Sequence, residues 1–203
     1  MSADLDNLIH QCALGVAPST MAAIIKVESG GNPWAIGDNT AGGRVSPTPR
    51  NIDEAAARAL ELIRLGHSID IGLAQINSNN LKAYGVSVRD VLEPCTNIYI
   101  GSRILSNFYL KSVEKYGPGE VSLFHSLSAY NTGSFYNGPK YVLKILNAAG
   151  SKASISMVSW RQPASKPDYR KTNQQFIFNS PIIAFQAPVY PSEKTKKLNH
   201  SSN

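Results

Sequence analysis

One carboxylate stands at an unusual place in the sequence. Met21, Ile24 and Ile25 mark one face of a predicted helix by their spacing, and Glu28 is the next position on that face. Ser29 and two glycines then end the helix. Burial and the negative end of a helix dipole both raise the pKa of a carboxylic acid, so Glu28 is predicted to hold a proton near neutral pH, as a general acid does. The alternative is a frayed last turn that swings the carboxyl group into water.

A second polar cluster is "DIGLAQIN", residues 70 to 77. Gly72 follows an extended pair and permits a sharp turn. Gln75 and Asn77 carry amides that can each donate and accept hydrogen bonds, which suits the recognition of sugar hydroxyl or N-acetyl groups. Ordinary turn polarity explains the cluster equally well if it stands alone.

The third cluster is "AYNTG", residues 129 to 133. Tyr130 and Asn131 lie at a predicted helix end followed by Gly133, where an aromatic ring and an amide can line a groove. Phe135 and Tyr136 add faces on which sugar rings can stack. A plain helix terminus with a left-handed glycine is the alternative.

The elements that must position these clusters are mostly helical up to Gly150. Leu5, Leu8, Ile9 and Cys12 follow helical spacing, so Cys12 is expected to face a core. The expected N-terminal caps of later helices are Ser19, Asn51 in a capping box with Glu54, and Thr96.

Three further helices complete the expected domain. A small helix ends at Gly85, a helix over 119–131 has Val121, Phe124 and Leu127 on or near one face, and Pro139 begins a last helix with Tyr141 inward. Residues 32–50 are predicted to form a long loop, with a short hairpin as a possibility. The pattern favours a mainly α fold of the α+β kind, with a helical domain and a small loop or hairpin region.

The formal charge divides the chain at the same place. Residues 1–150 hold 12 Lys and Arg against 12 Asp and Glu, whereas residues 151–203 hold 8 against 2. We therefore expect a neutral domain over 1–150 and a basic, mostly disordered tail over 151–203, not a nucleic-acid-binding fold. In the tail, "FIFNSPIIAF" is the exception that could form a strand or dock on a partner.

Composition excludes several classes of protein. No apolar run approaches membrane-spanning length, and "MSADLDNLIHQ" is not a signal peptide, so the chain is expected to be cytosolic or to lack a leader it once had. The four histidines are isolated and no metal or cofactor motif is present, so neither a metal nor a cofactor is expected. The cysteine count alone favours neither two free thiols nor one disulfide for Cys12 and Cys95.

Taken together and in order, the three clusters resemble the lytic transglycosylases of the soluble-lytic-transglycosylase type, which have a lysozyme-like fold. The resemblance covers roughly residues 5–150. The segments "VESGGNP" and "DIGLAQIN" are most similar to the small transglycosylases that accompany type IV secretion systems. Many related enzymes have Met where this chain has Ala74, and the smaller side chain is expected to thin one wall of the cleft.

The resemblance implies a role for each motif residue. Glu28 would be the sole catalytic acid and base, Ser29 would steady its carboxyl group or the departing sugar, and the remaining positions would bind substrate: Gln75, Asn77, Tyr130 and Asn131. It also favours a disulfide between Cys12 and Cys95. The implied setting is the periplasm, with peptidoglycan glycan strands as substrate and secretion-system components as partners of the tail.

The implied reaction needs no water. Glu28 protonates the oxygen between N-acetylmuramic acid and N-acetylglucosamine, the substrate's acetamide stabilises the sugar cation, and Glu28 then accepts the C6 hydroxyl proton as the 1,6-anhydro ring closes. A lysozyme that uses Asp70, or more remotely Asp53 or Asp38, as a second carboxylate is the nearest rival. A non-catalytic wall-binding assembly protein is the rival from another class.

Overall fold

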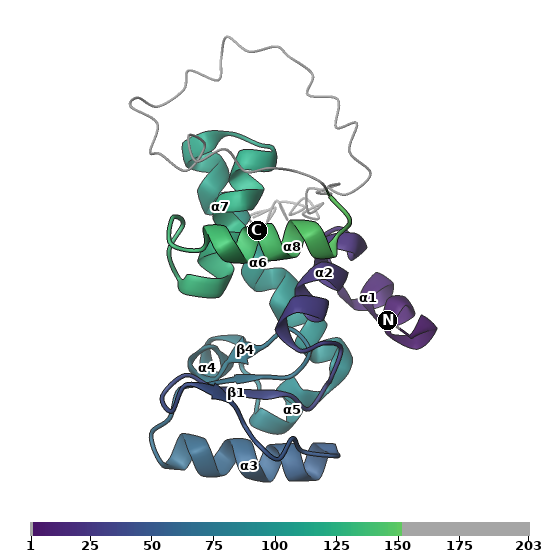
Figure 1. Ribbon diagram of the computed structural model, residues 1–203, viewed down its shortest axis with the longest axis vertical. Coiled ribbons are helices and arrows are strands. Elements are labelled where there is room, and N and C mark those ends of the chain that lie inside the picture. The colour runs from purple at the N-terminus through teal and green to yellow at the C-terminus, as the bar shows by residue number, and fades with distance from the viewer. Residues whose placement is uncertain (1, 152–203) are drawn as a thin grey trace, which may run out of the picture.

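The computed structural model describes residues 2–151 and consists of two lobes joined by one long helix (Figure 1). The helical lobe contains α1 (Ala3–Cys12), α2 (Pro18–Glu28), α6 (Pro94–Tyr116), α7 (Glu120–Thr132) and α8 (Pro139–Ala148). The smaller lobe contains β1 (Ile36–Asp38), β2 (Gly43–Arg44), α3 (Ile52–Arg64), β3 (Ile69–Ile71), β4 (Ile76–Asn77), a 3₁₀ turn (Ser78–Asn80), α4 (Leu81–Tyr84) and α5 (Val88–Leu92). This arrangement confirms the mainly α fold with a small hairpin region.

The N-terminal caps predicted for two helices are wrong, and both of these helices begin with proline. α2 begins at Pro18 and α6 at Pro94, and neither Ala17 nor Glu93 caps its helix through a side chain. The expected caps Ser19 and Thr96 are wrong because both residues lie inside the first helical turn. Proline has no N–H to satisfy and its φ is already helical, so the helix starts at the proline itself.

The N-terminus of α3 is capped as predicted, although only by half of a capping box. The Asn51 side chain accepts a hydrogen bond from the backbone N–H of Glu54 at 2.9 Å. The Glu54 carboxylate instead binds the guanidinium of Arg50 at 2.9 Å. A full capping box does occur between Ser87 and Asp90, at the start of α5, a helix that was not predicted.

The sheet is antiparallel, with the strand order β2-β1-β3-β4. The β1–β2 hairpin confirms the short hairpin expected within residues 32–50. On the inner strand β3, Ile69 and Ile71 are fully buried, so the side chain of Asp70 points to the opposite face of the sheet. That face is the one turned toward the other lobe.

The core confirms the apolar stripe of α2, because Met21, Ile24 and Ile25 are completely inaccessible to solvent. The face predicted for α7 is wrong in part, since Val121 is 40% exposed. The buried face of α7 contains serines: Ser122 donates to the carbonyl of Gly117 at 2.5 Å, and other serines of the helix bind backbone carbonyls in the same way. Because these buried residues are polar, the spacing of apolar residues does not reveal this face of α7.

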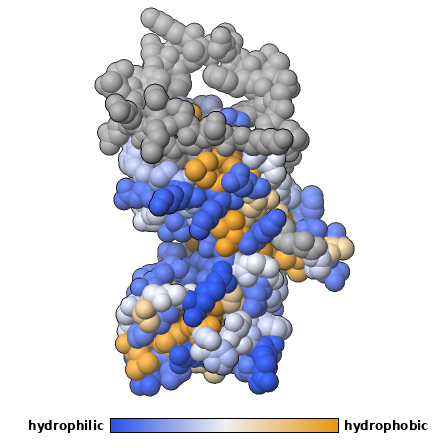
Figure 2. All heavy atoms as spheres, viewed as in Figure 1, coloured by the Kyte–Doolittle hydropathy of each residue, from blue (hydrophilic) through white to orange (hydrophobic). Residues whose placement is uncertain are grey.

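Apolar and polar residues are separated on the surface. Figure 2 shows apolar residues gathered beside α8 and again near α3, with hydrophilic residues between them. Within residues 2–151 no helix has the length and apolar character needed to cross a bilayer. The predicted tail and its "FIFNSPIIAF" segment lie outside the described residues, so the division of the chain at residue 150 stays a prediction.

One disulfide joins Cys12, at the end of α1, to Cys95, in the first turn of α6, with a Cα–Cα distance of 5.4 Å. The bridge expected from the resemblance is therefore present. It closes a loop of 83 residues in sequence separation.

Replacing both cysteines with alanine is expected to lower the free energy of unfolding by roughly 4 kcal/mol, because the unfolded chain regains the entropy of that loop. Urea titrations of the oxidised protein and of the double variant measure the difference. Adding a thiol reductant should lower the stability of the wild type and leave the variant unchanged. A variant as stable as the oxidised wild type would contradict the prediction.

Candidate active site

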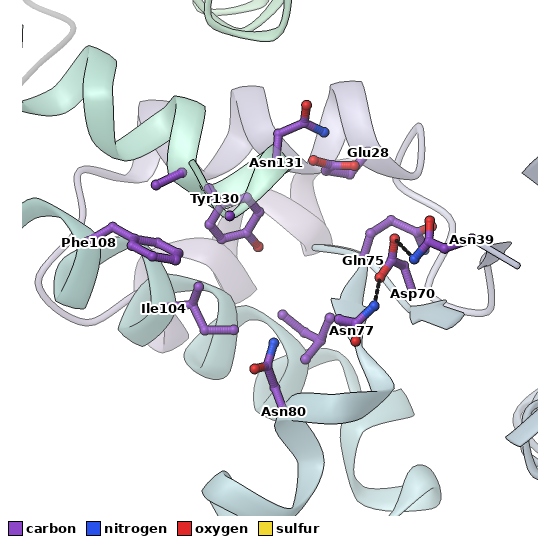
Figure 3. A pocket seen from close by; sticks show the side chains of 13 residues that line it. Glu28, Asn39, Asp70, Gln75, Asn77, Asn80, Ile104, Phe108, Tyr130 and Asn131 are labelled. Carbon is purple, nitrogen blue, oxygen red and sulfur yellow. Dashed lines mark hydrogen bonds between the residues drawn. The ribbon is translucent and has the colours of Figure 1, made fainter. Parts of the chain in front are cut away.

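A cleft of about 430 Å³ lies between the two lobes. Its walls come from α2, the sheet, α6 and α7, and the residues that line it are Glu28, Asn39, Asp70, Gln75, Ile76, Asn77, Asn80, Ile104, Phe108, Ala129, Tyr130, Asn131 and Gly133. Figure 3 shows Asn39, Asp70 and Asn77 together on the sheet side, and Ile104, Phe108 and Tyr130 on the side of α6 and α7. The cleft is thus polar on one side and largely aromatic or aliphatic on the other.

Glu28 is the last residue of α2 and is largely buried at the cleft wall. Burial raises the pKa of its carboxyl group above the ordinary value, and the negative charge of Asp70 raises it further. The hydroxyl of Tyr141 donates to Glu28 Oε1 at 2.5 Å and opposes this shift, as do the positive charges of Arg44 and Lys144. The net shift is upward, which confirms the direction predicted from the sequence.

The backbone of Glu28 is held from the other lobe. A guanidinium nitrogen of Arg44, on the hairpin strand β2, donates to the carbonyl oxygen of Glu28. This carbonyl is among the last of α2, which have no partner within the helix. The bond joins the end of α2 in the helical lobe to the hairpin of the sheet lobe.

Ser29 closes α2 and does not use its hydroxyl on the carboxyl group of Glu28. The hydroxyl donates to the carbonyl of Ile25 at 3.1 Å and accepts from the N–H of Gly31 at 3.1 Å, and the residue is buried. These bonds fix the direction in which the chain leaves Glu28. The expectation that Ser29 steadies the carboxyl group or the sugar by direct hydrogen bonding therefore has no support in this geometry.

The amide of Gln75 builds the turn between β3 and β4. Its Nε2 donates to the carbonyls of Ala35 at 3.1 Å and Gly72 at 2.9 Å. Gln75 has a φ of +50°, which L-residues seldom adopt. A side chain at Gly37 would place its Cβ 2.9 Å from Gln75 Oε1, so the glycine provides the room that the amide needs. Gln75 lines the cleft as predicted, with both amide protons committed to the protein.

A buried amide on α6 holds the other side of this turn. Asn97 is fully buried; its Oδ1 accepts from the N–H of Ala74 at 2.7 Å, and its Nδ2 donates to the carbonyls of Ile71 at 2.9 Å and Val91 at 2.7 Å. A Cβ on Gly72 would lie 2.3 Å from this Nδ2. The first glycine of the "GLAQIN" motif therefore allows the turn to approach α6.

Ala74 faces the helices and not the cleft, which corrects the expectation that it thins a cleft wall. It is fully buried, and a Cβ on Gly101 of α6 would lie 2.8 Å from the Ala74 Cβ. Its carbonyl accepts the hydroxyl of Tyr130 at 2.8 Å. The residue at position 74 thus sets the packing of the turn on α6.

Asp70 is held in the cleft by two side-chain amides. Its Oδ1 accepts from Asn77 Nδ2 at 2.7 Å and its Oδ2 accepts from Asn39 Nδ2 at 2.9 Å (Figure 3). Asn77 Nδ2 also donates to the hydroxyl of Ser68 at 3.0 Å. Asn77 lines the cleft as predicted, and in this structure its amide orients a carboxylate.

The third cluster contributes one anchored and one exposed residue. Burial raises the pKa of the Tyr130 phenol well above its usual value, and the negative charges of Glu28 and Asp70 add to the shift, so the hydroxyl stays protonated and donates to Ala74. Asn131 lines the cleft and is exposed. Phe135 packs edge-to-face on Phe108, with ring centroids 5.9 Å apart, and supports that wall.

The cleft brings together Glu28 with Gln75, Asn77, Tyr130 and Asn131. Three residues that the motifs did not identify bind its acidic residues: Tyr141 and Arg44 bind Glu28, and Asn39 binds Asp70. Tyr141 was expected to point inward but had no assigned role. A buried tyrosine hydroxyl usually has a hydrogen-bond partner, so the prediction that Tyr141 points inward could have led to a search for that partner, which is Glu28. Arg44 and Asn39 lie in the hairpin, where no motif or spacing in the sequence indicated a role for them. Within residues 2–151, no group of three metal-binding side chains is present.

A helical lobe and a small sheet lobe that face each other across an acid-bearing cleft define a lysozyme-like domain. Residues 8–142 match the family described as "Transglycosylase SLT domain", and the chain belongs to this family. No solved structure gave a significant match.

The curated relatives carry the name virB1. The chain is 40% identical over 150 residues to "Type IV secretion system protein virB1" of Brucella abortus, a match that covers 70% of this chain and 62% of the relative. It is 37% identical over 149 residues to "Protein virB1" of Agrobacterium fabrum, covering 72% and 60%. The chain thus spans about three fifths of the length of the curated relatives it matches.

Replacing Asn97 with alanine is expected to lower the free energy of unfolding by about 4 kcal/mol, because the N–H of Ala74 and the carbonyls of Ile71 and Val91 lose their partner in a dry site. Urea unfolding followed by circular dichroism measures the loss. Lys111→Ala, which shortens an exposed side chain on the same helix, is the control and should change stability by no more than about 0.5 kcal/mol. Similar losses in the two variants would contradict the role given to Asn97.

Glu28→Gln should stabilise the protein above the pKa of Glu28. A carboxyl group whose pKa is raised on folding contributes its full stability below the unfolded pKa, and the contribution is lost as the pH rises through the folded pKa. Glutamine cannot ionise, so the variant should match the wild type near about pH 4 and exceed it near about pH 8. Urea midpoints at both pH values measure this, with Glu114→Gln on the surface of α6 as the control for one lost charge. A variant no more stable than wild type at the higher pH would contradict the burial argument.

Proposed function

We propose that the chain is a peptidoglycan lytic transglycosylase that cleaves the bond between N-acetylmuramic acid and N-acetylglucosamine and leaves 1,6-anhydro ends. The observation that carries the proposal is a largely buried Glu28, with a raised pKa, on the wall of a 430 Å³ cleft. Membership in the Transglycosylase SLT family supports it.

In the proposed reaction Glu28 acts first as an acid and then as a base. Its burial keeps a proton available for the glycosidic oxygen, and Tyr141 leaves Oε2 free to face the sugar because its hydroxyl binds Oε1. Once the proton has left, the same hydroxyl stabilises the carboxylate. Glu28 then accepts the proton of the C6 hydroxyl as O6 bonds to C1, so no water is consumed.

The substrate is proposed to lie across both walls. The Tyr130 ring and the Phe108 wall would contact sugar faces, and the exposed Asn131 amide would bind the sugar at the scissile bond. Gln75 would present Oε1 to the cleft, because its amide protons are used within the turn. Asn77 would act mainly through the carboxylate that it orients.

A muramidase that hydrolyses the same bond is the second candidate. Asp70 favours it, because this carboxylate lines the same cleft as Glu28, is held by two amides and acts electrostatically on Glu28. Such a fixed carboxylate could activate water or stabilise a sugar cation. The products separate the two reactions, since an anhydro end has one water less than a reducing end.

Mass spectrometry of muropeptides released from purified peptidoglycan tests the proposal. The wild type is expected to release 1,6-anhydro products, and Glu28→Gln is expected to lower the rate at least about 10³-fold, because the acid and the base are lost together. Products that all carry reducing ends would establish the muramidase instead. Sedimentation with insoluble peptidoglycan shows whether Glu28→Gln still binds glycan, and unchanged lysis by this variant would overturn the assignment of Glu28.

The setting is also proposed. The virB1 relatives, one of them named as a type IV secretion system protein, support a role in opening the cell wall locally for a secretion or conjugation apparatus in the periplasm. The basic residues of 151–203 would hold the enzyme near anionic wall or membrane surfaces or contact components of the apparatus.

A further inference from the structure

Two positive charges lie beside Glu28, where they work against its proton. Arg44 on β2 and Lys144 on α8 both act electrostatically on the Glu28 carboxyl group and lower its pKa, against the effect of burial. An acid that must hold its proton until the substrate binds gains nothing from neighbouring cations. Their position therefore calls for a further role.

The geometry places both cations next to the acid from opposite lobes. The Arg44 guanidinium binds the backbone carbonyl of Glu28, so its position is fixed relative to that residue. Lys144 lies one helical turn beyond Tyr141, whose hydroxyl binds the Glu28 carboxyl group, and residues three apart share a helix face. Tyr141 is buried and Lys144 is exposed, so Lys144 lies where this face of α8 meets solvent, within electrostatic range of Glu28.

Neither cation has an acidic partner in an ion pair among the described residues. Within residues 2–151 the ion pairs are formed by other side chains, and neither Arg44 nor Lys144 joins one. Arg44 is exposed and its guanidinium has five N–H donors, of which the bond to Glu28 uses one. The remaining donors match a carboxylate.

We propose that Arg44 and Lys144 form a carboxylate-binding subsite, which recognises the acidic group attached through the lactyl ether of the muramic residue at the scissile bond. This inference rests on the proposed function for its substrate. The acidic group is the free lactyl carboxylate in strands without stem peptides, and the first carboxylates of the stem where the peptide is present. The subsite would make the enzyme prefer charged glycan over neutral glycan of the same backbone.

The subsite also couples substrate binding to the proton on Glu28. The charged or titratable groups that act on Glu28 are Tyr141 and Lys144 on α8, Arg44 on β2, Asp70 on β3 and Tyr130 on α7. A bound carboxylate neutralises the two cations among them, so that only the hydrogen bond from Tyr141 still opposes the effects of burial and Asp70 on the pKa of Glu28. The pKa of Glu28 therefore rises when the charged substrate binds, and the acid keeps its proton when it is needed.

The test compares charged and neutral forms of one glycan. The substrates are stem-bearing strands, stem-free strands, and each of these after amidation of its carboxylates. Arg44→Gln/Lys144→Gln is expected to lower kcat/KM on the charged strands about tenfold more than on the amidated strands, because only the charged strands lose two partly exposed charge-assisted contacts. Arg64→Gln/Lys111→Gln removes two exposed cations elsewhere and should stay within about twofold on all four.

Two further measurements separate charge recognition from a structural effect. Arg44→Lys keeps the charge and should recover much of the loss on charged strands. In the wild type, the pKa obtained from kcat should exceed that from kcat/KM on charged strands, and the difference should shrink on amidated strands. A loss confined to stem-bearing or to stem-free strands identifies which carboxylate is bound.

The inference fails if the double variant loses as much on amidated as on charged strands, or loses nothing on charged strands. Its failure is distinct from that of the proposed function, because affinity is also measured in the Glu28→Gln background. If the wild type gives only reducing ends, the reaction that forms 1,6-anhydro ends is excluded. Even then, weaker binding of charged strands by Glu28→Gln/Arg44→Gln/Lys144→Gln than by Glu28→Gln still supports the subsite.

Discussion

The fully buried side-chain amide of Asn97 joins the sheet lobe to the long helix α6. It lies on α6, the helix common to both lobes, and binds the carbonyls of Ile71 and Val91 together with the N–H of Ala74 in a site that excludes water. The turn after β3 can reach α6 only because residue 72 is a glycine. The position of the sheet wall of the cleft thus depends on one buried amide and one missing side chain.

The opposite wall depends on how α2 ends. Five buried residues of the helix fix its orientation. The hydroxyl of Ser29 closes its last turn, and Arg44 binds the carbonyl of Glu28. Glu28 is left with its carboxyl group at the cleft and with Tyr141 as its direct partner. The protonation of this acid is a balance in which burial outweighs a hydrogen bond and two cations.

Patterns local in sequence predicted the elements and the acid well, because helical spacing places Glu28 beside Met21, Ile24 and Ile25 without reference to the rest of the chain. Contacts distant in sequence were beyond such patterns. Tyr141 meets Glu28 across 113 residues, and Asn39 meets Asp70 across 31. The motif amides were correctly placed at the cleft, but their assigned partners were sugars, whereas Gln75 and Asn77 bind the protein. The residue type alone does not distinguish an amide that binds the protein from an amide that binds a ligand.

The disulfide encloses a large part of the site within one covalent loop, which matters when the backbone of that loop is cleaved. Glu28, Arg44, Asp70, Gln75 and Asn77 all lie between Cys12 and Cys95. A protease that cuts the exposed tip of the β1–β2 hairpin therefore makes two fragments that stay covalently joined. The acid and the sheet wall then remain on one molecule, and the cut ends are still held by the helices on either side. One bridge between the first and the longest helix therefore confines the effect of a cut in the exposed hairpin to the hairpin itself.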